Sequence, residues 1–474
     1  MTQHSYLLGR RTFLGQAVST SFVLGITTSC FADQLGLIKS YKDSSLANDP
    51  HYFLTVAIPN GVDATYLFDA RPLEMTVANL QVNYLGEDPT LWQDSKGGST
   101  LVTSLVKPLE KWRSNFSIIN GVVMSTLDGH EQNMNAFLTG NPFGGDMILP
   151  IHSTEKFPIG FIQTGPMYGT TITNSALGLT MSPDQCKQLS KSAANFASAG
   201  HPITRSLLRL TQSKTGGNGR LSHSARNLSQ AIGMAPDMAQ KFSKLDFDIP
   251  TGNQPSEDEK FTNNIKANVN MIAATFLNEL TRSALLEMNP GDLDTHGPQD
   301  AKDLPIVMKR LALGLSAIFE ALANIEHSEG RSMLDCTTIV ISSEFSRTMR
   351  QPGLAIDKSG TDHNGLSNTI LVGGKGIQGG LILGETDYRT PDEELSQAHL
   401  SLDGQKVRRM GKPFDFAKEE HTNSHLTEYS PYSYLSPNNI TNTLQEILKI
   451  DRKHRFKFGR ETPNASVLKK LIKA

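Results

Sequence analysis

Short runs of β-branched and aliphatic residues alternate along this chain with longer segments of helical periodicity. The strand-like runs cover residues 52–58, 116–123, 337–342 and 368–372, and a further run lies near residue 285. Strands of this kind, separated by long helices, are typical of α/β proteins with a mostly parallel sheet. The sequence therefore predicts an α/β sandwich in which helices cover a mostly parallel central sheet.

The helical segments show the apolar stripe expected of helices that pack on a sheet. The strongest covers residues 306–325, where Leu311, Leu315 and Ile318 share one face. Further helices are expected over 101–116, 131–138, 271–286 and 439–450. These elements indicate a single domain over residues 50–450. Residues 192–257, rich in Ser, Asn, Gln and Gly, are expected to form a mainly helical, polar insertion, and 451–474 a basic tail.

The first 32 residues have the composition of a targeting signal rather than of a folded element. Arg10 and Arg11 precede a short, weakly apolar run without charge that ends at Ala32. This pattern resembles a twin-arginine export signal, with an amphipathic helix as the alternative. We expect a periplasmic or secreted bacterial protein that uses the twin-arginine export machinery and has no transmembrane span in the mature chain. Lipid anchoring at Cys30 is the less favoured reading.

Charge, cysteine content and the absence of a nucleotide-binding motif limit which partners and functions can be expected. The chain has 45 basic and 47 acidic side chains, for a net charge of −2, so nucleic acid is not an expected partner. Of the three cysteines, Cys186 and Cys336 could pair in an oxidising compartment. No glycine motif for a dinucleotide opens a helix after the first strand, which argues against a dehydrogenase.

Acidic, histidine and hydroxyl residues gather where the predicted strands end. In parallel sheets, ligands bind beyond the carboxyl ends of the strands. Carboxylate oxygens and imidazole nitrogens together are typical ligands of divalent cations. The candidates, in chain order, are Asp63, Ser125, Thr126, His130, Asp294, His296, Glu344, Arg347, Asp362 and His363.

Each of these residues also has a purely structural interpretation. Asp63 and Asp362 could be turn residues, and His130 could cap the helix that follows it. Glu344 and Arg347 could form a salt bridge. Their common position at one edge of the predicted sheet favours a site over a set of unrelated turns.

Several segments resemble an exported bacterial family known as domain of unknown function 1501. They are VAIPNGVDATYLF, GHEQNMNAFLTG, LDTHGPQ, TIVISSEFSRT, GTDHNG and ILVGGKGIQGGLILGETD, in this order over residues 50–450. The family is grouped with the alkaline phosphatase and sulfatase superfamily. The resemblance implies an alkaline-phosphatase-like α/β/α fold with one or two divalent ions, such as zinc, calcium or manganese, beside a Ser or Thr nucleophile.

The resemblance also assigns roles to individual residues. It implies that the metal ligands are Asp63, Asp294, His296, Glu344 and His363, with Asp362 as an additional candidate. Thr126 or Ser125 is then the candidate nucleophile, and Arg347 or His130 would stabilise the negative charge that develops during the reaction. Two positions depart from the pattern: Phe345 stands where the superfamily has a ligating histidine, and Gly129 where relatives often carry serine.

Two functions follow from these expectations. The first is an exported, metal-dependent hydrolase that acts on a phosphate or sulfate ester of a small molecule or polysaccharide. The second, favoured by Phe345 and Gly129, is a non-catalytic exported binding or assembly protein that keeps the same fold.

Overall fold

The computed structural model describes the greater part of the chain between residues 50 and 473. The described residues are 50–77, 80–125, 127, 129–153, 157, 159–165, 172, 178–196, 240–250, 255–348, 360–389, 408–422, 433–451, 455 and 465–473. The predicted signal segment, most of the predicted insertion and much of the predicted basic tail lie outside them. No helix within the described ranges combines the length and the apolar character needed to cross a membrane.

An eight-stranded sheet lies at the centre, in the order β16-β6-β15-β12-β1-β9-β7-β8. The strands are β1 (Tyr52–Ile58), β6 (Phe116–Val122), β7 (Phe161–Thr164), β8 (Gly178–Thr180), β9 (Ser283–Glu287), β12 (Thr337–Ser343), β15 (Asn368–Gly374) and β16 (Ile382–Leu383). Strand β15 runs antiparallel to both of its neighbours, whereas every other pairing is parallel. The prediction of a mostly parallel sheet is confirmed.

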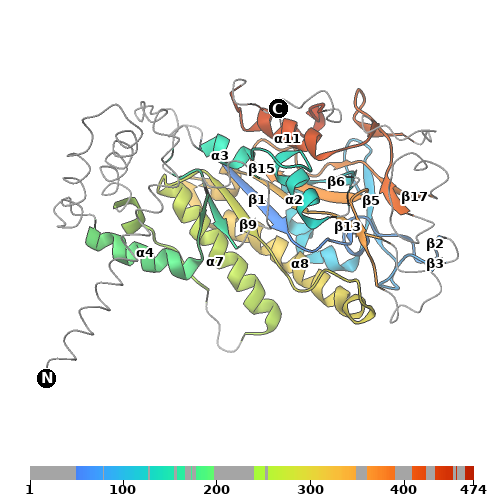
Figure 1. Cartoon of the computed structure of the whole chain (residues 1–474), viewed down its shortest axis with the longest axis horizontal. Coiled ribbons are helices and arrows are strands. Elements are labelled where there is room, and N and C mark those ends of the chain that lie inside the picture. Colours follow the sequence, from blue (N-terminus) through green and yellow to red (C-terminus); the bar gives the residue numbers. More distant parts are fainter. Residues whose placement is uncertain are drawn as a thin grey trace.

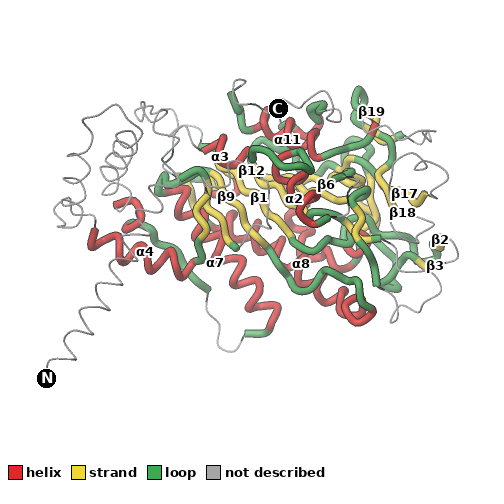
Figure 2. The backbone as a smooth tube through the Cα atoms, viewed as in Figure 1, coloured by secondary structure: helices red, strands yellow, loops and turns green. Residues whose placement is uncertain are grey.

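Helices cover both faces of this sheet, so the molecule has three layers (Figures 1 and 2). One face packs on η3 (Ser104–Asn115), α4 (Pro183–Phe196), α7 (Glu257–Leu277), α8 (Pro298–Asn324) and α9 (Met333–Cys336). The other face packs on α2 (His130–Thr139), α3 (Ile148–Ser153) and α11 (Pro437–Ile447). Within β1, Leu54 and Val56 enter the first core and Phe53 and Ala57 the second, as the alternation of side chains along a strand requires.

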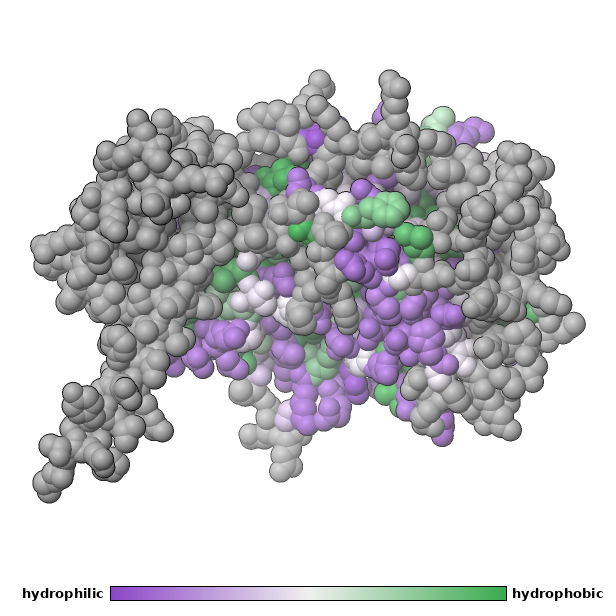
Figure 3. Space-filling model, viewed as in Figure 1, coloured by the Kyte–Doolittle hydropathy of each residue, from purple (hydrophilic) through white to green (hydrophobic). Residues whose placement is uncertain are grey.

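Smaller elements decorate the sheet. They are η2 (Ala64–Tyr66), η8 (Lys469–Leu471), and the two-stranded pairs β2 (Thr76–Val77) with β3 (Leu80–Gln81), β4 (Thr90–Gln93) with β5 (Ser99–Val102), β10 (Glu326–Ser328) with β11 (Arg331–Ser332), β13 (Ser346–Arg347) with β14 (His363–Asn364), β17 (Thr386–Arg389) with β18 (Arg408–Gly411), and β19 (Phe414–Asp415) with β20 (Glu420–His421). Figure 3 shows that the described part of one face of the molecule is mainly hydrophilic, with small hydrophobic areas between.

Two predicted helices differ from the observed elements. Residues 101–116 form the end of β5 and then the 3-10 helix η3, which contains Pro108. Proline lacks the N–H that a regular α-helical interior needs, which disfavours an α-helix here. The helix predicted over 271–286 ends at Leu277, because Glu279 takes a left-handed φ of +53° and the chain re-enters the sheet as β9. Most apolar residues on both sides of that turn, such as Phe276, Leu280 and Leu285, are buried, which extended the apparent periodicity.

The two cysteines that could have paired do not form a disulfide. Cys186 in α4 and Cys336 in α9 are both buried, and neither is part of a disulfide. Burial raises the pKa of the Cys186 thiol to about 12, so this group is inert at neutral pH.

Candidate metal centre

The loops that follow β1, β6, β9 and β12 meet at the carboxyl edge of the sheet, as predicted. Ile58 at the end of β1 is in register with Ser343 at the end of β12, so Asn60 and Glu344 emerge side by side. The backbone N–H of Asn60 donates to Oε1 of Glu344 at 2.7 Å. This contact places a buried carboxylate at the base of the loops.

The turn after β1 depends on two residues with left-handed backbones. Asn60 has a φ of +74° and Gly61 a φ of +78°. A Cβ atom added at Gly61 would lie 2.3 Å from Cε2 of Phe345, so no larger residue fits there. The turn directs the Asn60 N–H to Glu344 and the Asn60 carbonyl oxygen to Arg347, which donates to it at 2.7 Å.

His130 is the first residue of α2, after the N-cap Gly129. Its Nδ1 lies 2.8 Å from Oε1 of Glu344, whose side chain is only 1% exposed. This hydrogen bond raises the pKa of His130 against the opposing effect of burial. The other carboxylate oxygen, Oε2 of Glu344, is buried and has no hydrogen-bond partner in the described structure.

Asp294 and Arg347 form the second pair of the site. The Arg347 side chain is fully buried and donates from Nη2 to Oδ1 of Asp294. Burial opposes the negative charge of Asp294, but the hydrogen bond and the charge of Arg347 outweigh it and lower the pKa of this carboxyl. Arg347 therefore pairs with Asp294 and not with Glu344, which corrects the alternative interpretation as a Glu344–Arg347 salt bridge.

Three further side chains, His296, Asp362 and His363, extend the site from Asp294. His296 Nε2 is 3.1 Å from Oδ1 of Asp294 and 3.1 Å from Nε2 of His363. His363 Nε2 is 3.6 Å from the same Asp294 oxygen. Asp362 Oδ1 is 3.6 Å from Nδ1 of His296 and also accepts the backbone N–H of His363 at 2.8 Å.

These side chains form two overlapping groups that could hold a cation. One consists of His130, Asp294 and His363, and the other of His296, Asp362 and His363; in each, one ligand atom per residue lies within 4.8 Å of the others. The first group is half-buried, whereas His296 and Asp362 in the second are exposed. His363 belongs to both.

Phe345 forms the floor under the histidines. It is completely buried, its ring stacks on His363 with centroids 4.2 Å apart, and it contacts His130 at 4.9 Å. Its apolar ring cannot ligate a cation. It instead fixes the planes of two imidazoles that can.

The remaining predicted site residues lie apart from these groups. Asp63 belongs to neither, because its Oδ1 accepts hydrogen bonds from Thr65 and lies 3.4 Å from Nη1 of Arg409. The Ser125 hydroxyl exchanges hydrogen bonds with the backbone of Leu127, at 2.9 and 3.1 Å. Thr126, the other candidate nucleophile, lies outside the described residues.

Two residues were missed by the sequence interpretation. Asn60 orients Glu344 and Arg347 through its backbone, and the Asn60-Gly61 turn signal could have indicated it. No sequence pattern indicates Arg409, because it contacts Asp63 from a strand 346 positions away in the chain.

Comparison with known proteins identifies the family. A model of the family described as "Protein of unknown function (DUF1501)" matches residues 165–401, which are 237 of the 474 residues, or half of the chain. No curated protein matches the chain. Among solved structures, it is similar to the alkaline phosphatase from the Antarctic bacterium TAB5, at 10% identity over 69% of this chain and 92% of that chain, with a TM-score of 0.26. A TM-score this low does not establish a shared fold, and the α/β architecture is shown by the sheet order and layers described above. The family match shows that the chain belongs to the DUF1501 family of proteins of unknown function.

Proposed function

We propose that this protein is an exported, metal-dependent hydrolase of phosphate or sulfate esters. The observation that carries the proposal is the pair of overlapping groups at the sheet edge, His130 with Asp294 and His363, and His296 with Asp362 and His363. Imidazole nitrogens and carboxylate oxygens within 4.8 Å of one another suit zinc or manganese.

The surroundings of the half-buried group favour it as the principal cation site. Histidines that bind metals usually donate their other ring N–H to a carboxylate, and Nδ1 of His130 lies 2.8 Å from Glu344. Because a carboxylate accepts this bond, Nδ1 carries the proton and Nε2 is the basic nitrogen left for a cation. Arg347 in turn orients Asp294. The unpaired, buried Oε2 of Glu344 adds negative charge that a cation nearby would offset.

A divalent cation bound there supplies Lewis-acid polarisation of a phosphoryl or sulfuryl oxygen. The chain itself holds the ligands: Glu344 orients His130, Arg347 orients Asp294, and Phe345 stacks under His363. In this proposal His130 is a ligand, Arg347 balances the charge of the site, and Asp63 has a structural role. His296 and Asp362, with side chains 48% and 50% exposed, face the direction from which a small-molecule or polysaccharide ester would enter.

A non-catalytic exported binding or assembly protein is the second candidate. One observation favours it: the Ser125 hydroxyl, a candidate nucleophile, is held by the backbone of its own turn. Such a protein would bind a structural ion at the same ligands and would turn over no ester.

Metal analysis and ester hydrolysis on the purified full chain test both candidates. We expect bound zinc or manganese, and hydrolysis of p-nitrophenyl phosphate or p-nitrophenyl sulfate that Asp294→Ala and His363→Ala abolish. His421→Ala is the matched control, since His421 pairs with Glu385 outside the site. Bound metal without turnover would support the second candidate. Protein that binds neither zinc, manganese nor calcium and shows no turnover would overturn the metal site itself.

A further inference from the structure

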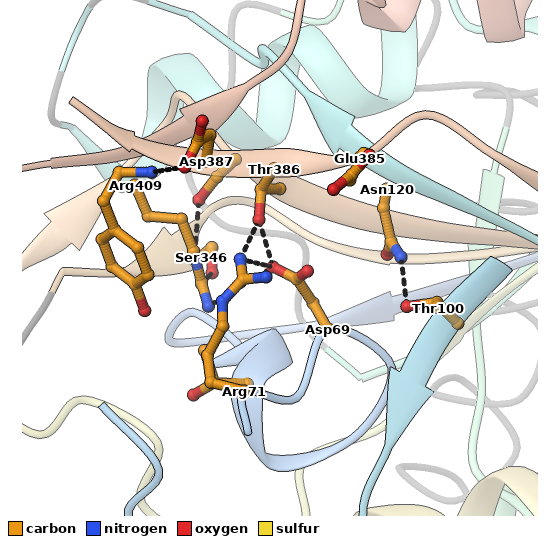
Figure 4. A network of polar contacts seen from close by, with 12 residues as sticks. Asp69, Arg71, Thr100, Asn120, Ser346, Glu385, Thr386, Asp387 and Arg409 are labelled. Carbon is orange, nitrogen blue, oxygen red and sulfur yellow. Dashed lines mark hydrogen bonds and ion pairs between the residues drawn. The ribbon is translucent and has the colours of Figure 1, made fainter. Parts of the chain in front are cut away.

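A network of charged and hydroxyl side chains surrounds the buried Arg409 of β18 (Figure 4). Arg409 and its partners Asp63 and Asp69 are each no more than 3% exposed. Nη1 of Arg409 lies 3.4 Å from Asp63 and 3.6 Å from Asp69. Burying a guanidinium this deeply costs free energy unless ion pairs and hydrogen bonds compensate for the lost hydration. The contacts of Arg409 therefore indicate what it holds in place.

The other contacts of Arg409 reach two segments that carry site residues. Nη2 donates to the hydroxyl of Ser346, which directly precedes Arg347. Nε donates to the hydroxyl of Ser367 at 3.2 Å, four residues after His363. One planar group therefore joins the strand that ends in Arg347 to the loop that leaves His363.

The same two segments are paired with each other. In the β13–β14 ladder, Arg347 is opposite His363 and Ser346 is opposite Asn364. The Asn364 side chain donates to Ser367 Oγ at 2.9 Å and to the backbone oxygen of Arg409 at 2.9 Å. Arg409 is thus bonded through both its side chain and its backbone to the ladder that presents Arg347 and His363 to Asp294.

The far side of Arg409 is anchored to the end of β1. Asp63 caps η2 and is held there by the N–H and hydroxyl of Thr65, at 3.1 and 2.7 Å. Asp69 is held by Arg71 at 3.1 Å and by the Thr386 hydroxyl at 2.6 Å, as Figure 4 shows. Two carboxylates and two guanidiniums balance one another, so the anchor is electrically neutral.

We infer that Arg409 is a positioning residue for the metal centre: it ties the β13–β14 ladder to the Asp63 anchor and so keeps His363 and Arg347 within reach of Asp294. The inference rests on the proposed function in its metal-binding part and does not depend on turnover. It also gives Asp63 a role as the anchor of Arg409.

Arg71 provides a matched control within the same network. It contacts Asp69, Thr386 and the ring of Tyr388, and within the described residues it makes no hydrogen bond or ion pair with Ser346, Ser367 or the β13–β14 ladder. Arg409 is buried, the Arg71 side chain is 11% exposed, and both pair with Asp69. Replacing either one removes a positive charge beside Asp69, but only Arg409 touches the segments that carry the ligands.

The test compares Zn²⁺ affinity of the full chain, measured by chelator competition, for wild type, Arg409→Gln, Arg409→Lys, Ser346→Ala and Arg71→Gln. We expect Arg409→Gln to weaken Zn²⁺ binding by about 10- to 100-fold, the range typical of groups that orient metal ligands. Ser346→Ala should weaken binding less, and Arg409→Lys should restore part of the loss. Arg71→Gln should leave the affinity near that of wild type even where its Tm falls. Equal losses in Arg409→Gln and Arg71→Gln, or no loss in Arg409→Gln, would overturn the inference.

Histidine NMR spectra provide a readout that needs no metal. With ¹³C-labelled histidine, we expect the ring resonances of His363 to move in Arg409→Gln and Ser346→Ala and to stay in place in Arg71→Gln. Ser346→Ala, which keeps all buried charges, serves where Arg409→Gln does not fold. If wild type binds neither zinc, manganese nor calcium and shows no turnover, the proposed function fails, and the His363 resonances alone decide whether Arg409 positions the ladder. Unmoved resonances in Ser346→Ala and Arg409→Gln would then refute it.

Discussion

Nδ1 of His130 and Oε1 of Glu344 lie 2.8 Å apart, although 214 positions separate the two residues in the sequence. The contact joins the start of α2 to the end of β12, and the backbone N–H of Asn60 shares the same carboxylate oxygen. Because Nδ1 is engaged by Glu344, Nε2 is the ring nitrogen of His130 that is left for a cation. Because Glu344 belongs to neither group of candidate ligands, its effect on metal affinity can be measured with all of those ligands still present.

Glu344→Gln is expected to weaken Zn²⁺ binding by about 10- to 100-fold, because a neutral amide orients His130 less firmly and removes a buried negative charge. Isothermal titration calorimetry measures this directly. Glu385→Gln is the matched control, since Glu385 forms a similar pair with His421 at 2.7 Å outside the site. Equal affinities of Glu344→Gln and wild type would contradict the orienting role of Glu344.

Gly61→Ala should destabilise the fold more than an alanine at another left-handed glycine. Gly86 has a φ of +67° with nothing within 4 Å of an added Cβ, so Gly86→Ala reports the backbone strain alone, about 1–2 kcal/mol. Gly61→Ala adds the clash with Phe345, for a further loss of about 1–3 kcal/mol. Urea unfolding of both variants measures the difference. A similar loss in both would show that the turn and Phe345 move apart without cost.

Because of Glu287, at the end of β9, the free energy of unfolding is expected to fall as the pH rises. Burial raises its pKa from 4.5 to about 7, and its Oε2 has no hydrogen-bond partner in the described structure. Between these two values the unfolded chain has released the proton and the folded chain has kept it, so stability declines with rising pH through this window. Glu287→Gln should raise the Tm at pH 8 and leave it nearly unchanged at pH 4. A gain of the same size at both values would exclude ionisation of Glu287 as the cause.

Metal removal should lower stability through the same ligands. When free Zn²⁺ is about 100 times its Kd, a site present only in the folded chain adds about 2.7 kcal/mol to the free energy of unfolding. Chelation should remove this increment in wild type, and His363→Ala should lack it from the start. Urea unfolding with and without chelator measures both. His421→Ala should keep the increment, and its loss there would place the ion elsewhere.

The sequence by itself determined the class of fold and the edge at which to look. Runs such as Tyr52–Ile58 and Thr337–Ser343 are β-branched and apolar enough to be buried on both faces, so their strands and the mostly parallel sheet could be predicted from local pattern. The rule that ligands lie beyond the carboxyl ends of parallel strands selected Asp294 and His296 after β9. His363 precedes β15 and reaches the same edge only because β15 runs antiparallel, a direction that the sequence did not predict.

Only the tertiary structure decided which polar groups meet. Asp63 has the sequence of a strand-end ligand, yet a guanidinium from β18, 346 positions away, occupies its carboxylate. Arg347 pairs with Asp294 and Glu344 with His130, and the backbone of Asn60 bonds to both Arg347 and Glu344. Strand formation depends on neighbours along the chain, whereas a hydrogen bond depends on ångström-scale distances between distant segments. Those distances are set when the whole core packs, and no local pattern records them.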